Sequence, residues 1–561
     1  MLVDVTGHRY GPRWFIAIGL NLVLLAWGHV GLCAIMVYPV DPYAATPILP
    51  ATNPIPVLPS GRIEIQACRG ESEPGSFVIR ASQPLAMVRM VPTDLTSEGG
   101  TTISASAVDL RLVKCWYQAG TVMRNPGQRV LVPELLVKDD DLVRVDLNKQ
   151  RNYLRVDAAG KTRYIEISTG GATLPTRVVF NDAKNLLPFD LSAHFNKQVW
   201  VTVNVPDRAV PGKYTGKIVV EDANGWRAEI SLEVTVLPFD LAPPVLEYAI
   251  YYRGKVTSDS YPEIGSELKS SAQYGRELND MKDHGIGYPT LYQRYDDLHL
   301  REAFAVRQRM DFAYDHLYTL GTTTANRTDP RGLAELDWRV RIWVSMARRY
   351  GYGKVYIYGV DEAREERLEA QRSSWEVVHR EGAGMFVALY EGAVDVAGDD
   401  IDVAILSGFK PAEVEKWHRK GKRVLCYGNP QVVTNDMTVY RRNYGLLLWL
   451  GRYDGCMPYA YQHAFGNIWN DFDHPKYRDH VFAYPTSDGL VGTVQWEGFR
   501  EAVDDVRYLS TFLRIEPQAE FKVRRYLASK LSDDHTQPSE LREWLIDRIV
   551  SLSDIGPVAD K

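Results

Sequence analysis

Cysteine is scarce in this chain, which has only five cysteines in 561 residues. They are odd in number and widely spaced along the chain: Cys33, Cys68, Cys115, Cys426 and Cys456. This spacing excludes a framework of several disulfides and a CxxC metal site. A single bridge between Cys68 and Cys115 stays open.

An excess of basic residues is also missing. Sixty-five Lys and Arg residues face 71 Asp and Glu residues, for a net charge of −6. Without a basic excess to neutralise phosphates, nucleic acid is excluded as the main partner. The sequence also lacks HExxH, Walker, GxSxG and dinucleotide-binding motifs, and its histidines, among them His463, His474 and His480, have no metal-ligand spacing. No metal or organic cofactor is implied.

Aromatic residues, by contrast, are abundant, with 13 Trp and 32 Tyr. Most of these rings are expected to fill cores. The remainder suit sugar faces and polar clefts, because they are flat, rigid and amphipathic.

The longest apolar run, from Trp14 to Tyr38, contains no formal charge. About 25 helical residues at 1.5 Å each would span roughly 37 Å, enough for a bilayer core of about 30 Å. Arg9 and Arg13 precede the run and Asp41 follows it, so the N-terminus is expected to be cytoplasmic. We therefore predict a transmembrane anchor in residues 1–38, with a cleaved signal peptide as the alternative; both place the body of the protein outside the cytoplasm.

Composition and periodicity divide the rest of the chain. Residues 39–60 carry seven prolines and predict an extended stalk. Residues 61–240 contain short alternating strands separated by turn residues, typical of a β-sandwich. In residues 241–515, strand-like and helix-like runs alternate, which favours a TIM-like (β/α)₈ barrel, and residues 516–561 predict C-terminal helices. The expected fold class is thus multidomain, α/β plus all-β, with a transmembrane segment in front.

The candidate chemistry is a pair of adjacent acids, Asp361 and Glu362. They follow the strand-like run KVYIYGV at 354–360, and barrel enzymes place their catalytic groups where strands end. The alternative is that both acids stabilise the first turn of a helix. Gly359 is expected to permit the turn that brings both side chains to one site.

Five segments in order along the chain resemble motifs of one known family: Ala67–Ala81 (ACRGESEPGSFVIRA), Gly359–Ala363 (GVDEA), Gly421–Pro430 (GKRVLCYGNP), Gly466–Phe472 (GNIWNDF) and Phe499–Phe512 (FREAVDDVRYLSTF). The chain from about residue 61 to 515 resembles glycoside hydrolase family 123, which includes β-N-acetylgalactosaminidases, and related domains of unknown function. Two positions depart from the family pattern, since Ala363 replaces a common Pro and Gln495 a common Arg.

The resemblance implies a retaining glycosidase in which the sugar's own acetamido oxygen is the nucleophile. Asp361 would stabilise the acetamido group and Glu362 would act as general acid and base. The residues expected to bind the sugar are Tyr252, Tyr390, Tyr427, Trp449, Trp469 and Asn470.

Two alternatives remain open at this stage. In the first, the enzyme cleaves a sugar without an acetamido group and Asp361 is the direct nucleophile. In the second, the scaffold has no catalytic activity and binds glycans or serves as a structural surface protein. The expected partners are a glycan and, through the N-terminal helix, a membrane. Sequence alone leaves open the exact sugar, the linkage, exo or endo action and the oligomeric state.

Overall fold

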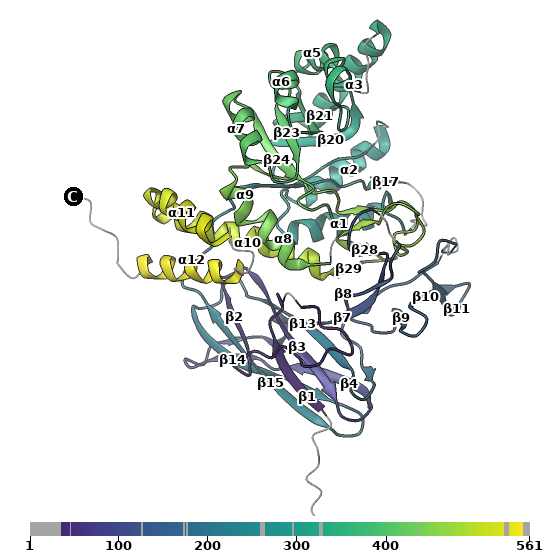
Figure 1. Cartoon of the computed structure of the whole chain (residues 1–561), viewed down its shortest axis with the longest axis vertical. Helices are drawn as coiled ribbons and strands as arrows, with labels where there is room; N and C mark the ends of the chain where they lie inside the picture. The colour runs from purple at the N-terminus through teal and green to yellow at the C-terminus, as the bar shows by residue number, and fades with distance from the viewer. Residues whose placement is uncertain are drawn as a thin grey trace, which may run out of the picture.

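The computed structural model describes residues 35–553, apart from 45, 125–126, 172–173, 175–177, 258–263, 294, 296, 325–328, 434 and 532–537. The molecule is elongated, with a β-sandwich at one end and a parallel barrel at the other (Figure 1). Three C-terminal helices, α10 (Val494–Ile515), α11 (Glu520–Leu531) and α12 (Pro538–Ser553), lie along the junction.

Two sheets form the sandwich, and their alternating apolar residues face each other in one core. The first sheet has the order β1-β3-β13-β7-β8-β29-β28, and the second has the path β12-β4-β14-β15-β2, with β5 and β6 attached. Their bounds are β1 Ile35–Val40, β2 Ile63–Ala67, β3 Ser72–Ala81, β4 Leu85–Pro92, β5 Leu95–Ser97, β6 Thr102–Ile103, β7 Val108–Gln118, β8 Val130–Val137, β12 Phe189–Leu191, β13 Asn196–Asn204, β14 Gly212–Glu221, β15 Arg227–Val236, β28 Ala483–Pro485 and β29 Leu490–Thr493. A smaller sheet joins β9 Val143–Asp146, β10 Arg151–Ala158 and β11 Lys161–Glu166.

The two parts of the molecule share a sheet. The hairpin β28–β29 comes from near the end of the barrel segment, yet β29 pairs with β8 of the sandwich through Gly492↔Leu136 and Thr493↔Leu135. Helix α10 begins directly after β29, with the Thr493 side chain accepting a hydrogen bond from the N–H of Trp496. The sandwich is therefore completed by a strand that leads into the junction helix.

The expected transmembrane segment is contradicted. Its last residues belong to β1, which pairs antiparallel with β3 from Ile35↔Ala81 to Val40↔Ser76. In the part of the chain that the structure describes, no helix has the length and apolar character needed to span a bilayer. Residues 14–34 of the expected segment lie outside the described residues. The end of the apolar run thus belongs to a sheet strand, and Ile35 and Val37 face the sandwich core.

The proline-rich segment expected to form a stalk lies against the sandwich. Tyr43 and Ile48 are buried, and the Asn196 side chain donates to the carbonyl of Thr52 at 2.7 Å. Proline excludes helix here, but the apolar residues between the prolines still pack on the first sheet.

Eight parallel strands build the barrel in chain order: β16 Glu247–Ile250, β19 Tyr288–Pro289, β20 His316–Thr323, β21 Lys354–Tyr358, β22 Gly384–Leu389, β23 Val403–Ser407, β24 Arg423–Tyr427 and β25 Gly455–Cys456. Between β19 and β20 the backbone pairing among the described residues is the single bridge Leu291↔Thr319, so the barrel is nearly closed. All six residues of β22 are buried, as expected where a parallel strand is covered on both faces.

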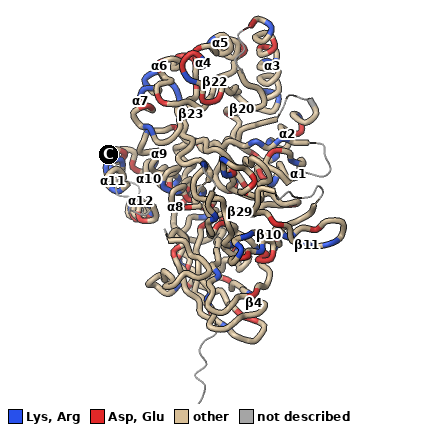
Figure 2. Tube along the Cα trace, turned by 45° about the vertical axis from the view of Figure 1, so that its right-hand side comes forward, with Lys and Arg blue, Asp and Glu red and all other residues tan. Residues whose placement is uncertain are grey.

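Helices cover the outside of the barrel: α1 Ser271–Asp283, α2 Asp297–Arg309, α3 Pro330–Arg349, α4 Glu365–Glu369, α5 Arg372–Arg380, α6 Ala393–Ala397, α7 Pro411–Arg419, α8 Met437–Tyr444 and α9 Leu446–Leu450. Local sequence sets their ends. Helix α3 begins where the Asp329 side chain accepts from the N–H groups of Arg331 and Gly332. Helix α7 stops before Gly421, whose φ of 70° few other residues adopt. Basic and acidic residues are interspersed along these helices (Figure 2), in line with the balanced composition.

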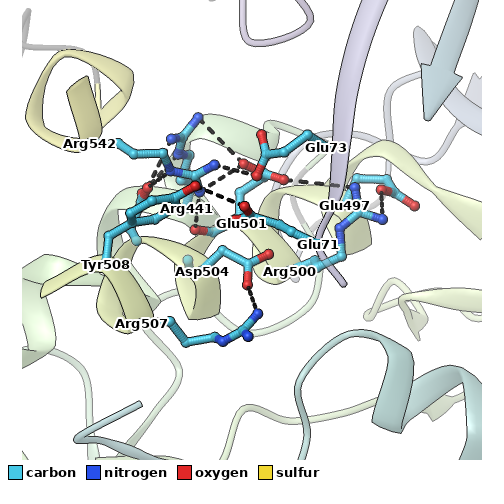
Figure 3. Close-up of polar contacts among 12 residues, drawn as sticks. Glu71, Glu73, Arg441, Glu497, Arg500, Glu501, Asp504, Arg507, Tyr508 and Arg542 are labelled. Carbon is cyan, nitrogen blue, oxygen red and sulfur yellow. Dashed lines mark hydrogen bonds and ion pairs between the residues drawn. The ribbon is translucent and has the colours of Figure 1, made fainter. Parts of the chain in front are cut away.

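A buried ionic network joins the sandwich to the junction helices (Figure 3). Arg542 of α12 contacts Glu73 of β3 at 2.5 Å and Asp505 of α10 at 2.6 Å. Arg441 of α8 forms a second ion pair with Asp505 at 2.8 Å. Because these groups come from both parts of the chain and are desolvated, removing one partner would leave an uncompensated charge in the junction.

The cysteines form no bridge among the described residues. Cys68, Cys115, Cys426 and Cys456 are all free, which decides the question of a bridge between Cys68 and Cys115. Cys33 lies outside the described residues.

Candidate functional site

Asp361 and Glu362 lie at the C-terminal end of β21, where the backbone leaves the strand. The Gly359 N–H still bonds the carbonyl of Phe386 at 3.0 Å, and the Glu362 N–H bonds the carbonyl of Ala388 at 3.1 Å. Glu362 itself has a φ of 49°, a left-handed conformation that non-glycine residues rarely adopt outside functional or tightly constrained sites. This turn allows two adjacent side chains, which in a strand would point to opposite faces, to enter one cavity.

Gly359 contributes through packing and not through the turn. A Cβ at this position would lie 2.9 Å from the Cβ of Val387 on β22, closer than carbon atoms can approach. Gly359 is also absent from the residues with positive φ. The glycine thus lets two neighbouring strands come together just before the acidic pair.

A cavity of about 1180 Å³ opens at this end of the barrel. Its floor and walls come from the residues that follow several barrel strands, and one side comes from the sandwich segment between β7 and β8. The lining includes Thr121, Val122, Met123, Arg124, Tyr251, Arg253, Tyr292, Leu320, Thr323, Tyr358, Asp361, Glu362, Arg367, Tyr390, Ser407, Tyr427, Gln431, Tyr459, His463, Phe465, Tyr477 and His480. The site is therefore rich in phenol rings and shared by both parts of the molecule.

Two tyrosines hold Glu362. The hydroxyl of Tyr390 donates to one oxygen of the Glu362 carboxylate, and the hydroxyl of Tyr427 donates to the other. Burial and the bond to Glu362 raise the pKa of Tyr427, so this phenol stays protonated and remains a donor. The Arg364 guanidinium lies 3.8 Å from the centre of the Tyr390 ring and fixes the outer phenol by a cation–π contact.

A separate pair of tyrosines supports Asp361. The Tyr358 hydroxyl donates to Asp361 Oδ1 at 2.6 Å and lies 3.2 Å from the Tyr251 hydroxyl. Burial raises the pKa of Asp361, the negative charge of Glu362 raises it further, and the bond from Tyr358 opposes both effects. Two neighbouring carboxyl groups in a partly desolvated site do not readily ionise together, because their negative charges repel. One of them then keeps its proton and serves as the acid while the other stays ionised.

Opposite the acids, a polar chain runs along the cavity wall. Arg253 donates to the Tyr459 hydroxyl at 3.3 Å, and that hydroxyl lies 2.9 Å from His463 Nδ1. Burial lowers the pKa of His463 to about 4 and that of His480 to about 3. Both imidazoles are therefore neutral at physiological pH and act as hydrogen-bonding walls without charge.

The structure brings four of the expected residues together and leaves four elsewhere. Tyr390 and Tyr427 line the cavity with the acidic pair. Tyr252 is fully buried and donates to Glu277 at 2.6 Å, while its neighbour Tyr251 faces the cavity because successive residues alternate in direction.

The remaining expected residues serve packing in other places. Trp449 is buried under the Arg524 guanidinium at 3.9 Å. Trp469 lies in the sandwich core and donates to the carbonyl of Pro485 at 2.8 Å. Asn470 is buried and donates to the carbonyl of Thr169 at 2.8 Å. The GNIWNDF segment thus supports the sandwich and does not line the cavity.

Sequence reasoning missed several residues of the site, among them Tyr251, Tyr358, Arg253, Tyr459 and His463. Their signal was partly visible, since Tyr358 lies in the strand-like run before the acids and Tyr251 directly precedes the expected Tyr252. No local pattern marked the sandwich segment from Thr121 to Arg124, because its role depends on how the two parts of the chain meet.

One group of possible metal ligands occurs among the described residues, and it lies outside this cavity. Glu71, Glu73 and Asp504 each offer an oxygen within 4.8 Å of the others. Glu73 already pairs with Arg542, and Asp504 with Arg507 at 2.8 Å. Arginine side chains thus supply the positive charge that a metal ion would bring.

No family model matches the sequence, and neither does any curated protein. Among solved structures, a family 123 glycoside hydrolase from Clostridium perfringens, described for glycolipid glycan hydrolysis, is similar at a TM-score of 0.64 and 10% identity. The match covers 93% of this chain and 98% of that one. The chain shares the fold of this enzyme. The expected resemblance to family 123 is therefore confirmed at the level of the fold.

Two further glycoside hydrolases align less well. A family 39 enzyme from Bacteroides cellulosilyticus has 10% identity and a TM-score of 0.33, over 70% of this chain and 82% of that chain. A family 5 xyloglucanase from Bacteroides ovatus has 8% identity and a TM-score of 0.28, over 80% and 99%.

Proposed function

We propose that this protein is a retaining glycoside hydrolase that cleaves N-acetyl-β-hexosaminides with help from the substrate's acetamido group. The observation that carries the proposal is the convergence of Asp361 and Glu362 in one phenol-lined cavity at the C-terminal face of the barrel. A shared fold with a family 123 enzyme supports it. No nucleophile from the protein is required, which fits a site whose two acids are adjacent in sequence and held by separate tyrosines.

In the first step, the acetamido oxygen attacks the anomeric carbon and the bond to the leaving oxygen breaks. Glu362 gives its proton to that oxygen, and Asp361 stabilises the positive charge that develops on the acetamido nitrogen. In the second step, Glu362 takes a proton from water, and the water oxygen attacks the anomeric carbon and reopens the ring. Because Tyr390 and Tyr427 occupy both oxygens of Glu362, the leaving oxygen must replace one phenol when substrate binds.

The test is hydrolysis of 4-nitrophenyl glycosides with and without a 2-acetamido group, by the wild type and by single variants. Asp361→Asn and Glu362→Gln should each lower kcat by about 100-fold or more, the range of general acid–base and electrostatic catalysis. For Glu362→Gln, the loss should grow as the leaving group becomes poorer. The matched control is Glu366→Gln, an exposed acid on α4, which should keep full activity.

The alternatives give different results. Cleavage only of sugars without an acetamido group, still abolished in Asp361→Asn, would refute the acetamido mechanism and make Asp361 the nucleophile. Glycan binding without hydrolysis of any glycoside would favour a binding protein on the same scaffold.

A further inference from the structure

A second cavity of about 420 Å³ adjoins the candidate active site. Its lining consists of Lys255, Tyr292, Tyr295, Leu320, Gly321, Thr322, Thr323, Trp338 and Arg339. Three of these, Tyr292, Leu320 and Thr323, also line the cavity of the acidic pair. The two cavities therefore share a wall.

Two exposed aromatic side chains border this second cavity. Trp338 of α3 is 51% exposed and Tyr295 is 37% exposed, and their rings meet edge to face at 5.3 Å. The two rings thus leave apolar surface side by side at the edge of the cavity. Together the rings offer the flat amphipathic surface on which a pyranose ring stacks.

The junction between the cavities is held rigidly. Arg253 and Lys255 lie 4.8 Å and 4.3 Å from the centre of the Tyr292 ring. Glu267 anchors both cations, with 2.8 Å to Arg253 Nε and 2.7 Å to Lys255 Nζ. Tyr292 is thus a fixed element shared by the two cavities.

The charges of the second cavity are already balanced. Of its two cationic side chains, Lys255 pairs with Glu267 and Arg339 pairs with Glu335 at 2.6 Å. No unpaired charge among the described residues remains to attract an ionic ligand. Exposed rings and paired charges together favour a neutral occupant with a flat face that can stack, as a pyranose ring has.

We propose that the cavity between Tyr295 and Trp338 is a subsite for additional neutral sugar units of the substrate. The inference rests on the proposed glycosidase function and extends it. It makes an oligosaccharide the preferred substrate, in place of a single sugar with a small leaving group. A chain bound at the acidic pair passes Tyr292 and stacks on Trp338.

The experiment compares kcat/KM on two substrates: the 4-nitrophenyl glycoside that the wild type cleaves, and the tetrasaccharide of the same sugar. Trp338→Ala should lower kcat/KM on the tetrasaccharide about tenfold, which corresponds to about 1.4 kcal/mol, through KM and with no change on the aryl glycoside. Trp338→Phe should restore part of the loss. Tyr295→Ala should give a loss of the same selectivity, because its ring borders the same cavity.

Phe521→Ala is the matched control, because Phe521 is 75% exposed on α11 and lines neither cavity. It should behave as the wild type on both substrates. If wild type and Trp338→Ala cleave both substrates with the same ratio of kcat/KM, the subsite is refuted while the glycosidase stands. If no glycoside is cleaved by the wild type, the proposed function fails, and the subsite fails with it.

Discussion

The ionic network at the junction predicts how stability depends on pH. Glu71 is buried, and its Oε2 accepts from the N–H of Cys68 at 2.6 Å and from the hydroxyl of Tyr508 at 2.8 Å. Its Oε1 has no hydrogen-bond partner among the described residues. Burial, with the nearby charge of Asp504, raises the pKa of Glu71 from 4.5 to about 7, although Arg542 and the two hydrogen bonds oppose this.

The sign of the effect follows from proton counting. Between pH 4.5 and 7 the folded protein keeps a proton on Glu71 that the unfolded chain has lost, so stability falls as pH rises through this window. At 1.36 kcal/mol per pKa unit, the loss reaches about 3 kcal/mol by pH 8. Glu71→Gln removes the titrating group, and the amide oxygen can still accept from Cys68 and Tyr508. The variant should therefore match the wild type near pH 5 and exceed it by up to about 3 kcal/mol at pH 8.

Thermal unfolding of both proteins between pH 5 and 8.5 measures this difference. Taking variant minus wild type at each pH cancels the titration of groups that both proteins share. The matched control is Glu64→Gln on the exposed face of β2, which should give a constant difference. If the stability difference between Glu71→Gln and the wild type does not change with pH, or becomes smaller toward pH 8, the assignment of a raised pKa to Glu71 is refuted.

Three further predictions concern the active site. Tyr427→Phe removes one of the two hydrogen bonds that orient the Glu362 carboxyl group, worth about 0.5–1.5 kcal/mol, and should lower kcat by about 2- to 10-fold with KM nearly unchanged; an effect on KM alone would contradict it. Tyr358→Phe removes the bond that lowers the pKa of Asp361, so the acidic limb of the pH–rate profile should move to higher pH, and a limb that stays in place would count against ionised Asp361. Gly359→Ala forces a Cβ to within 2.9 Å of the Cβ of Val387 and should cost about 1–3 kcal/mol of stability; an unchanged thermal unfolding midpoint would contradict this close approach.

How much the sequence predicts depends on the range of the interactions involved. The strand KVYIYGV and the acids after it were predicted from local periodicity, and β21 does carry Asp361 and Glu362 to the barrel end. Tyr252 was chosen as a site residue and Tyr251 was not, although Tyr251 is the residue that lines the cavity. The choice depends on where β16 ends, at Ile250, and strand ends are the least certain feature of a sequence pattern.

The N-terminal error has a different cause. An apolar run of 25 residues satisfies the length rule for a membrane helix, but the rule does not register that Ile35–Val40 pairs with β3 as a strand. Trp469 and Asn470 illustrate a third limit. Their motif was identified, but the segment packs against the sandwich through Pro485 and Thr169, and only the tertiary fold shows that.

The active-site cavity depends on the junction between sandwich and barrel, which links stability to function in this chain. The sandwich segment from Thr121 to Arg124 forms one side of the cavity, and its position is set by β7 and β8. The β8 strand pairs with β29, which continues into α10, and α10 carries Asp504 and Asp505 of the ionic network. A change that loosens the network would therefore shift one wall of the cavity relative to the acids on the barrel, and its effect on extended substrates should exceed its effect on small aryl glycosides.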